Sequence, residues 1–233
     1  MKDPLDIHTG NKIAIVAGAT GLIGNEVVRQ LLNHPAYGRV KVFVRRHLSF
    51  QHPKLQEIMT DFDRLEEYAH EFKGNDLFLC LGTTMAKAGS RKAFIKVDLT
   101  YNLKMARMAS DNKVHQVLLV SSVGADPDAL FFYSKVKGNL EQAIKQLPFW
   151  GIHIFQPSVL LGQREELRMG EKVAGSVGHW LDKVTGGGMT VYKPVHAETV
   201  ALAMIRVAQK LSGGVHTYES HIIAEIAGVE DPN

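Results

Sequence analysis

Lys12–Gly24 reads KIAIVAGATGLIG, and this stretch decides the fold. Its first half, Ile13–Ala17, is an unbroken apolar run, which is typical of a parallel strand buried on both faces. Three glycines spaced three apart follow, Gly18, Gly21 and Gly24, before a helical pattern begins. Glycines at a strand-to-helix turn let the backbone approach a ligand, and the amides and dipole of the helix N-terminus favour an anion. The stretch therefore predicts a phosphate-binding turn, with a tight turn that binds nothing as the alternative.

The composition is that of a globular domain, because 45% of the 233 residues are hydrophobic and 22% are charged. The formal net charge of +3 is small, and no Lys/Arg cluster is dense enough to indicate a nucleic-acid surface. No apolar segment is long enough to cross a bilayer or to form a secretory signal. The single cysteine, Cys80, excludes an internal disulfide. We therefore expect a cytoplasmic protein with no membrane or nucleic-acid partner.

Apolar segments of strand length alternate with helical patterns along most of the chain. The expected strands are residues 13–17, 40–44, 55–59, 76–81, 114–120 and 150–155, and residues 221–226 are a final strand or an extended tail. The helical patterns cover residues 22–32, 65–72, 90–108, 131–147 and 197–211. This alternation, with strands too apolar for a sheet that has one wet face, predicts an α/β fold with a doubly wound parallel sheet, the Rossmann fold.

The chain contains no linker or internal repeat, so we expect a single domain over residues 1–233. Within it, residues 160–195 are irregular and rich in glycine. We expect this stretch to form a small substrate-cap insertion over the carboxyl ends of the strands, where ligands bind in this architecture.

Glycines, hydroxyl groups and guanidinium groups recur where the expected strands end. The residues at these ends are Gly18–Gly24, Arg45-Arg46, Asp61-Phe62, Gly82-Thr83-Thr84, Ser121-Ser122 and Gln156-Pro157. Because the carboxyl ends of parallel strands share one edge of the sheet, we expect these residues to meet in one crevice.

Arg45 and Arg46 are the most informative of these residues for the ligand. A site for NAD has an acidic residue near the end of the second strand, where it accepts a hydrogen bond from the ribose 2′-hydroxyl. Two arginines there can instead bind a 2′-phosphate through paired hydrogen bonds. The pair predicts NADP(H) as the cofactor, with a solvated basic turn as the alternative.

Tyr133 and Lys137 lie four residues apart on the helix that follows Ser121-Ser122, and this spacing places both on one helical face. A phenol is a weak acid near neutral pH, and a nearby ammonium group favours its ionised form. The pair is a candidate proton donor and helper, although such pairs also occur on surfaces. Ser122, and as second choice Ser121, could hydrogen-bond a substrate carbonyl, unless both only cap the loop.

Several other chemistries have no support in the sequence. Cys80 lies in an apolar strand and is expected to be an inert core thiol. The histidines show no spacing typical of metal ligands, so no metal is predicted. Neither a nucleophile elbow nor a complete P-loop is present.

These motifs together resemble the short-chain dehydrogenase/reductase superfamily in its atypical branch: GATGLIG, the Ser-Ser strand end and YSKVK. More narrowly, further blocks resemble the Tat-interactive-protein-like oxidoreductases. They are VRRHLSF, TDFDRLEEYA, LCLGTTMAKAGS, KVDLTY, LLVSSVGAD, FFYSKVKGNLE, FQPSVLLGQREELRMGE and KPVHAETVA. The resemblance runs along nearly the whole chain, and LGTT-x-x-KAG and VLLG-x-R-x-E-x-R-x-GE are its most specific parts.

The resemblance implies NADPH binding and a reaction at a small carbonyl substrate, with Tyr133 as proton donor or acceptor and Lys137 as its helper and a ribose contact. The cofactor contacts that it implies are Thr20, Gly21, Leu22, Ile23, Arg45, Arg46, Asp61, Phe62, Leu81 and Gly82. Leu160 and Arg168 would border the nicotinamide and the substrate. Residues 156–158, Gln-Pro-Ser, depart from the Arg-Pro-Gly usual there.

The leading hypothesis is an NADPH-dependent carbonyl reductase or dehydrogenase that uses a Ser/Tyr/Lys site. The second is a regulatory protein that senses NADPH with little turnover and presents a surface to a protein partner. A third is an epimerase or dehydratase that recycles its nicotinamide, for whose nucleotide-sugar substrate the cap looks small. A protein partner or a homo-oligomer is compatible with each of these hypotheses.

Overall fold

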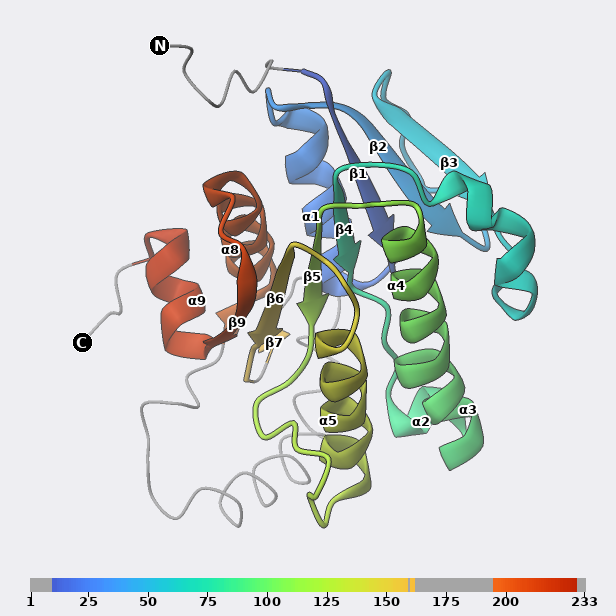
Figure 1. The fold of residues 1–233 in the computed structure, drawn as a ribbon, viewed down its shortest axis with the longest axis vertical. Coiled ribbons are helices and arrows are strands. Elements are labelled where there is room, and N and C mark those ends of the chain that lie inside the picture. Colours follow the sequence, from blue (N-terminus) through green and yellow to red (C-terminus); the bar gives the residue numbers. More distant parts are fainter. Residues whose placement is uncertain (1–9, 159, 162–194, 230–233) are drawn as a thin grey trace.

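Seven parallel strands run side by side through the middle of the molecule in the order β3-β2-β1-β4-β5-β6-β9 (Figure 1). The computed structural model describes residues 10–158, 160–161 and 195–229. The strands are β1 (Lys12–Ala17), β2 (Tyr37–Val44), β3 (Leu55–Met59), β4 (Asp76–Leu79), β5 (Gln116–Val120), β6 (Gly151–Gln156) and β9 (Gly214–Glu219). The strand order and the parallel pairing confirm the predicted α/β fold with a Rossmann-type sheet.

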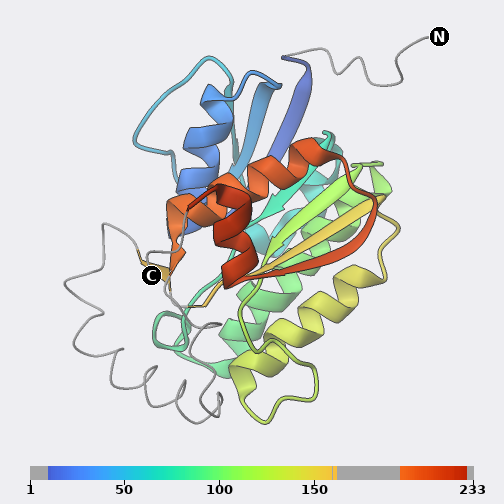
Figure 2. The same cartoon turned by 90° about the vertical axis from the view of Figure 1, so that its left-hand side faces the viewer.

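Helices cover both faces of this sheet (Figures 1 and 2). One face carries α1 (Leu22–Asn33), α8 (Ala197–Lys210) and α9 (Ser220–Ala227). The other carries the 3-10 helix η1 (Phe62–Glu71), α2 (Met85–Ala88), α3 (Arg91–Ile95), the π-helix η2 (Lys96–Tyr101), α4 (Asn102–Asp111) and α5 (Phe132–Lys145). Two short strands, β7 (Leu160–Leu161) and β8 (Val195–His196), pair in parallel and form a separate two-stranded sheet.

Successive strand residues alternate between two cores, as the period of two in a strand requires. Val16 of β1 and Leu118 of β5 belong to the core beneath α1 and α8. Their neighbours Ile15 and Leu119 belong to the opposite core beneath α4 and α5. Burial on both faces explains why these strands read as unbroken apolar runs.

The C-terminal part of the sheet differs from the sequence-based prediction. Residues 221–226, expected to be a strand or a tail, lie within helix α9. The last strand is β9, residues 214–219, which pairs with β6 and, among the described residues, forms an edge of the sheet. Its residues are exposed or half-buried, so its sequence, GVHTYE, lacks the apolar run that marks the central strands.

The helix expected after Ser90 is present but contains a turn of π-helix. Ser90 caps α3, since its Oγ accepts a hydrogen bond from the amide of Ala93 at 3.1 Å. The wider π-turn of η2 follows and then α4. As a result, Asp98 and Asn102 are buried where a regular helix through Phe94 would bury the half-exposed residues 97 and 101.

Most of the predicted cap, residues 160–195, lies outside the described residues. The prediction that residues 1–233 form one domain with a cap insertion stays a prediction. Among the described helices, none has both the length and the apolar character that crossing a bilayer requires.

Candidate functional site

The candidate site lies at the carboxyl edge of the sheet, where the strand order reverses between β1 and β4. In open α/β sheets this reversal opens a crevice between the loops that leave the two strands, and ligands bind there. The backbone amide of Cys80 donates to the carbonyl of Ala17 at 2.9 Å, so the ends of β1 and β4 meet directly.

The glycine turn after β1 has the geometry that the sequence predicts. Gly18 has φ +86°, and a Cβ there would lie 2.4 Å from the carbonyl oxygen of Cys80. A Cβ on Gly24 would lie 2.1 Å from the carbonyl oxygen of Gly18, so both positions need glycine for packing alone. Gly21 is the exposed N-cap of α1 and provides no capping side chain. The first amides of α1 therefore suit an anion, next to Thr20, Leu22 and Ile23.

The two arginines predicted to bind a phosphate follow β2 directly. Both Arg45 and Arg46 are exposed, and neither has an ion-pair partner among the described residues. The loop that carries them continues to His47 and Leu48, which contact Glu57 of β3. The guanidinium groups are thus available to a ligand, as a phosphate site requires.

Asp61 and Phe62, expected near the adenine, follow β3 and begin η1. The carboxylate of Asp61 caps this helix, accepting from the amide of Asp63 at 2.9 Å. The ring of Phe62 is buried and lies 5.6 Å from that of Tyr101. Asp61 is exposed at the edge, whereas Phe62 mainly packs in the core.

The loop after β4 is joined to α5 by a buried carboxylate, that of Asp98. Its Oδ1 lies 2.8 Å from Nζ of Lys137, and its Oδ2 accepts from the amide of Thr83 at 2.8 Å. A Cβ on Gly82 would lie 3.3 Å from the same Oδ1. The amide of Asn102 donates to the carbonyl of Leu81 at 3.0 Å. Two buried polar side chains of the η2–α4 helix thus hold the segment on which a cofactor would lie.

Lys137 is almost fully buried, with 6% of its surface exposed. Burial disfavours its charged form, but the negative charges that Tyr133 and Asp98 can carry outweigh burial and raise the pKa of Lys137. Lys137 is therefore a fixed ammonium group in the crevice.

Tyr133 lies one turn before Lys137 on α5 and is half-buried. Nζ of Lys137 is 5.9 Å from the centre of its ring, and the ring of Phe94 lies 5.7 Å away on another side. The structure thus brings the predicted pair together at the carboxyl edge, with the phenol side chain accessible.

The two serines after β5 have different environments. Oγ of Ser121 donates to Oε1 of Glu141 at 2.5 Å, and Nε2 of Gln156 donates to the same oxygen at 2.8 Å. Ser122 is half-buried, and its Oγ makes a 3.3 Å hydrogen bond to the carbonyl of Val123. Ser121 is thus committed to a buried network, whereas Ser122 is the more available hydroxyl.

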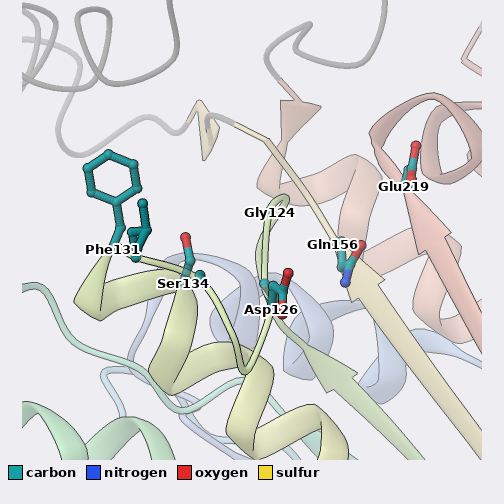
Figure 3. Close-up of a pocket in the computed structure, with 9 residues that line it drawn as sticks. Gly124, Asp126, Phe131, Ser134, Gln156 and Glu219 are labelled. Carbon is teal, nitrogen blue, oxygen red and sulfur yellow. The ribbon is translucent and has the colours of Figure 1, made fainter. Parts of the chain in front are cut away.

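An open hollow of about 490 Å³ lies beside these residues (Figure 3). The loop after β5 and the first turn of α5, with Ser134, line one side, and Gln156 and Glu219 at the ends of β6 and β9 line the other. Gly138 lets this loop cross α5 closely, because a Cβ there would lie 2.2 Å from the carbonyl carbon of Asp126. Ser134 lies next to Tyr133 in the sequence of α5, but neither Tyr133 nor Lys137 is among the residues that line the hollow.

The positions of the remaining predicted residues say less about ligand binding. The carbonyl of Pro157 accepts from the amide of Val123 at 3.1 Å, which ties the ends of β5 and β6 together. Leu160 pairs with Val195 in the small sheet, and Arg168 lies outside the described residues. Burial raises the pKa of Cys80 to about 12, consistent with an inert thiol. No group of side chains suited to a metal ion occurs in the described part of the chain.

Asp98, Asn102 and Glu141 were missed by the sequence analysis. The signal for the first two is that they lie at a spacing of four between Phe94 and Ala106, both of which are buried. The signal for Glu141 is its position one turn after Lys137 on the buried side of α5.

Comparisons with known proteins agree with this geometry. A family described as NAD(P)H-binding matches residues 18–146, which is more than half of the chain. HTATIP2 of Rattus norvegicus is 37% identical over 173 residues, 72% of this chain and 71% of that protein. FMP52 of Candida albicans is 33% identical over 201 residues, 84% and 87% of the two chains.

The chain belongs to the NAD(P)H-binding family, in the group of HTATIP2 and FMP52. The resemblance to Tat-interactive-protein-like oxidoreductases is thereby confirmed, and NAD(P)H is the class of cofactor.

Solved structures show the same fold. The UDP-N-acetylglucosamine 4-epimerase of Methanobrevibacter ruminantium superposes with a TM-score of 0.67 at 16% identity, over 89% of this chain and 76% of that one. A short-chain dehydrogenase/reductase superfamily protein from Agrobacterium tumefaciens, with bound NAD, superposes with a TM-score of 0.67 at 11% identity, over 93% of this chain and 82% of that one.

The predicted cellular location was wrong. The chain was expected to be cytoplasmic, but the FMP52 relatives from Candida albicans, Saccharomyces cerevisiae, Aspergillus oryzae and Coccidioides immitis are all named as mitochondrial proteins. A single cysteine fits any reducing compartment, so it did not distinguish the cytoplasm from an organelle.

Proposed function

We propose that this protein is an NADPH-dependent oxidoreductase that acts on a carbonyl group. The observation that carries the proposal is the buried Lys137–Asp98 ion pair, with Nζ 2.8 Å from Oδ1, beside a half-buried Tyr133 at the ligand edge of an NAD(P)H-binding fold. The phenol of Tyr133 and the ammonium group of Lys137 thus lie together at this edge, where a phenol can exchange a proton with a substrate oxygen.

The residues at the edge fit NADPH from end to end. The uncapped N-terminus of α1 at Gly21 suits the pyrophosphate, and the exposed Arg45 and Arg46 suit a 2′-phosphate. Leu81, Gly82 and Thr83, held by Asp98 and Asn102, form the surface beside the nicotinamide half.

When bound, the nicotinamide supplies the hydride, and the protein handles the proton. Tyr133 donates a proton to the carbonyl oxygen of the substrate as that oxygen gains negative charge. Ser122 donates a second hydrogen bond to the same oxygen, and Ser121 instead holds the loop through Glu141. The hollow next to Ser134 takes the remainder of the substrate.

The test is NADPH oxidation by the purified protein on a broad panel of aldehydes and ketones. We expect turnover with at least one class of carbonyl. We also expect Tyr133→Phe to lower it by about 10²–10⁴-fold, the usual contribution of general acid catalysis, with NADPH affinity unchanged. Absence of turnover by the wild-type protein across the panel, or full activity of Tyr133→Phe, would contradict the proposal.

A second candidate is an NADPH sensor that presents a surface to a protein partner. The observation that favours it is the exposure of two large apolar side chains beside the hollow, Leu130 at 99% and Phe131 at 45%. Tight NADPH binding without turnover, together with NADPH-dependent capture of a partner that Leu130→Ser abolishes, would support the sensor over the enzyme.

We further propose a mitochondrial location, because the FMP52 relatives carry that location in their names. Fractionation of cells that express the full chain tests this, and recovery in the cytosol alone would refute it.

A further inference from the structure

The loop that carries Arg45 and Arg46 is fastened to strand β3 by one side chain, Glu57. Oε1 of Glu57 accepts from the backbone amide of Leu48 at 2.6 Å, and Oε2 lies 2.6 Å from Nδ1 of His47. In the sheet, Glu57 is paired with Val42, so it reaches the loop from the neighbouring strand. One carboxylate therefore contacts the two residues that directly follow the arginines.

This attachment matters because no ion pair among the described residues orients the arginine side chains. Both side chains are exposed and make no ion pair in the described part of the protein. A guanidinium group binds a phosphate through paired hydrogen bonds only when it is correctly oriented. A loop fixed before binding loses less conformational entropy when the ligand arrives, and this raises affinity.

Glu57 carries its negative charge next to the loop that holds the two arginines. Partial burial raises the pKa of this carboxyl group, but hydrogen bonds from Leu48 and His47 and the charge of His47 lower it overall. An ionised carboxylate near a phosphate site repels the ligand, so its position there weakens binding unless it also orders the loop.

We propose that Glu57 is a positioning residue that sets the preference for NADPH over NADH, by fixing the loop that carries Arg45 and Arg46. The inference rests on the proposed NADPH preference and adds to it the residue that makes the preference possible. Glu57 acts through the loop, and the 2′-phosphate itself contacts the arginines.

The experiment is a titration of the purified full chain with NADPH and with NADH, for the wild-type protein and for Glu57→Ala and Glu57→Gln. We expect Glu57→Ala to weaken NADPH binding by about tenfold, roughly the lower end of the contribution of one charged hydrogen bond, and to leave NADH binding unchanged. Glu57→Gln keeps the shape and one accepting oxygen for the amide of Leu48, and its NH2 group can donate to an unprotonated Nδ1 of His47, so it should retain most of the preference.

Glu71→Ala is the matched control. Glu71 also contacts β2, with Oε2 3.1 Å from Nζ of Lys41, but it does not contact the arginine loop. This variant should retain the preference, and thermal unfolding of all variants shows that they are folded.

Three results would overturn the inference, and they differ in what else they overturn. If the wild-type protein prefers NADPH and Glu57→Ala keeps that preference, or binds NADPH more tightly, Glu57 does not position the loop and the proposed function stands. If Glu57→Ala weakens both cofactors equally, its role is only structural. If the wild-type protein shows no preference, the proposed NADPH specificity fails together with the inference.

Discussion

The two ends of the crevice use their cations in opposite ways. At the end of β2, Arg45 and Arg46 are exposed and have no ion-pair partner among the described residues. On α5, the helix that follows β5, Lys137 is 6% exposed and paired with the buried Asp98. The difference shows which task each end suits. Exposed cations are free to bind an anion, whereas a buried and paired ammonium is fixed in position and can influence a neighbouring phenol.

The largest effect on stability should come from breaking the buried pair. Asp98→Ala leaves the Lys137 ammonium buried without a counter-ion, and removing one partner of such a pair costs about 3–5 kcal/mol. Urea unfolding should show a midpoint lowered accordingly.

The control for this prediction is Glu66→Ala, which removes the partner of Lys104 in an exposed ion pair and should change stability little. Asp98→Leu combined with Lys137→Met should recover most of the loss, because apolar groups replace both charges. Equal effects of Asp98→Ala and Glu66→Ala would show that the buried pair contributes no more to stability than an exposed one.

At the exposed end, substitution should affect binding and not stability. Arg45→Ala removes charged hydrogen bonds to the 2′-phosphate worth about 1.5–3 kcal/mol, so NADPH binding should weaken by about 10–100-fold. NADH lacks that phosphate and should bind as before. Calorimetric titration with both cofactors measures this, and an equal loss for NADH would contradict the assignment of Arg45.

The smallest effect is a difference in alkaline stability. The pKa of Lys137 is raised in the folded protein above the ordinary value of 10.5, because the charges that Tyr133 and Asp98 can carry outweigh burial. A raised pKa stabilises the folded state fully below 10.5, and this contribution is lost as the pH rises through the folded-state value. Above 10.5 the wild-type protein should therefore lose stability more steeply than Lys137→Met.

Arg45→Ala serves as the comparison, since a guanidinium group stays charged over this range and its removal should leave the slope unchanged. Thermal unfolding over a series of alkaline buffers measures all three slopes. A wild-type slope equal to that of Lys137→Met would show that the pair does not stabilise the charged form.

Much of the site could be predicted because the carboxyl ends of parallel strands always lie at one edge of the sheet. Gly18, Arg45 and Ser122 come at or just after strand ends, and parallel strands bring those ends together whatever the details of packing. The central strands were equally clear, because burial on both faces gives them a continuous apolar sequence.

The parts that were missed depend on tertiary detail. A count of 3.6 residues per turn from Phe94 leads to Val97 and Tyr101, whereas the π-turn of η2 places Asp98 and Asn102 inside. Strand β9 is an edge strand with no buried face of its own to mark its sequence. The partnership of Ser121 with Glu141 joins residues 20 positions apart that no local pattern connects.

The measurement that tests the central claim most directly is isotope transfer. NADPH deuterated at the transferable position of the nicotinamide is incubated with the wild-type protein, and with Tyr133→Phe, and with the best carbonyl substrate from the panel. Mass spectrometry of the alcohol product then reports the transfer. We predict deuterium at the former carbonyl carbon with the wild-type protein and almost none with Tyr133→Phe. Unlabelled product, or equal labelling by both proteins, would contradict the assignment of Tyr133 and Lys137 as the reacting end of the crevice.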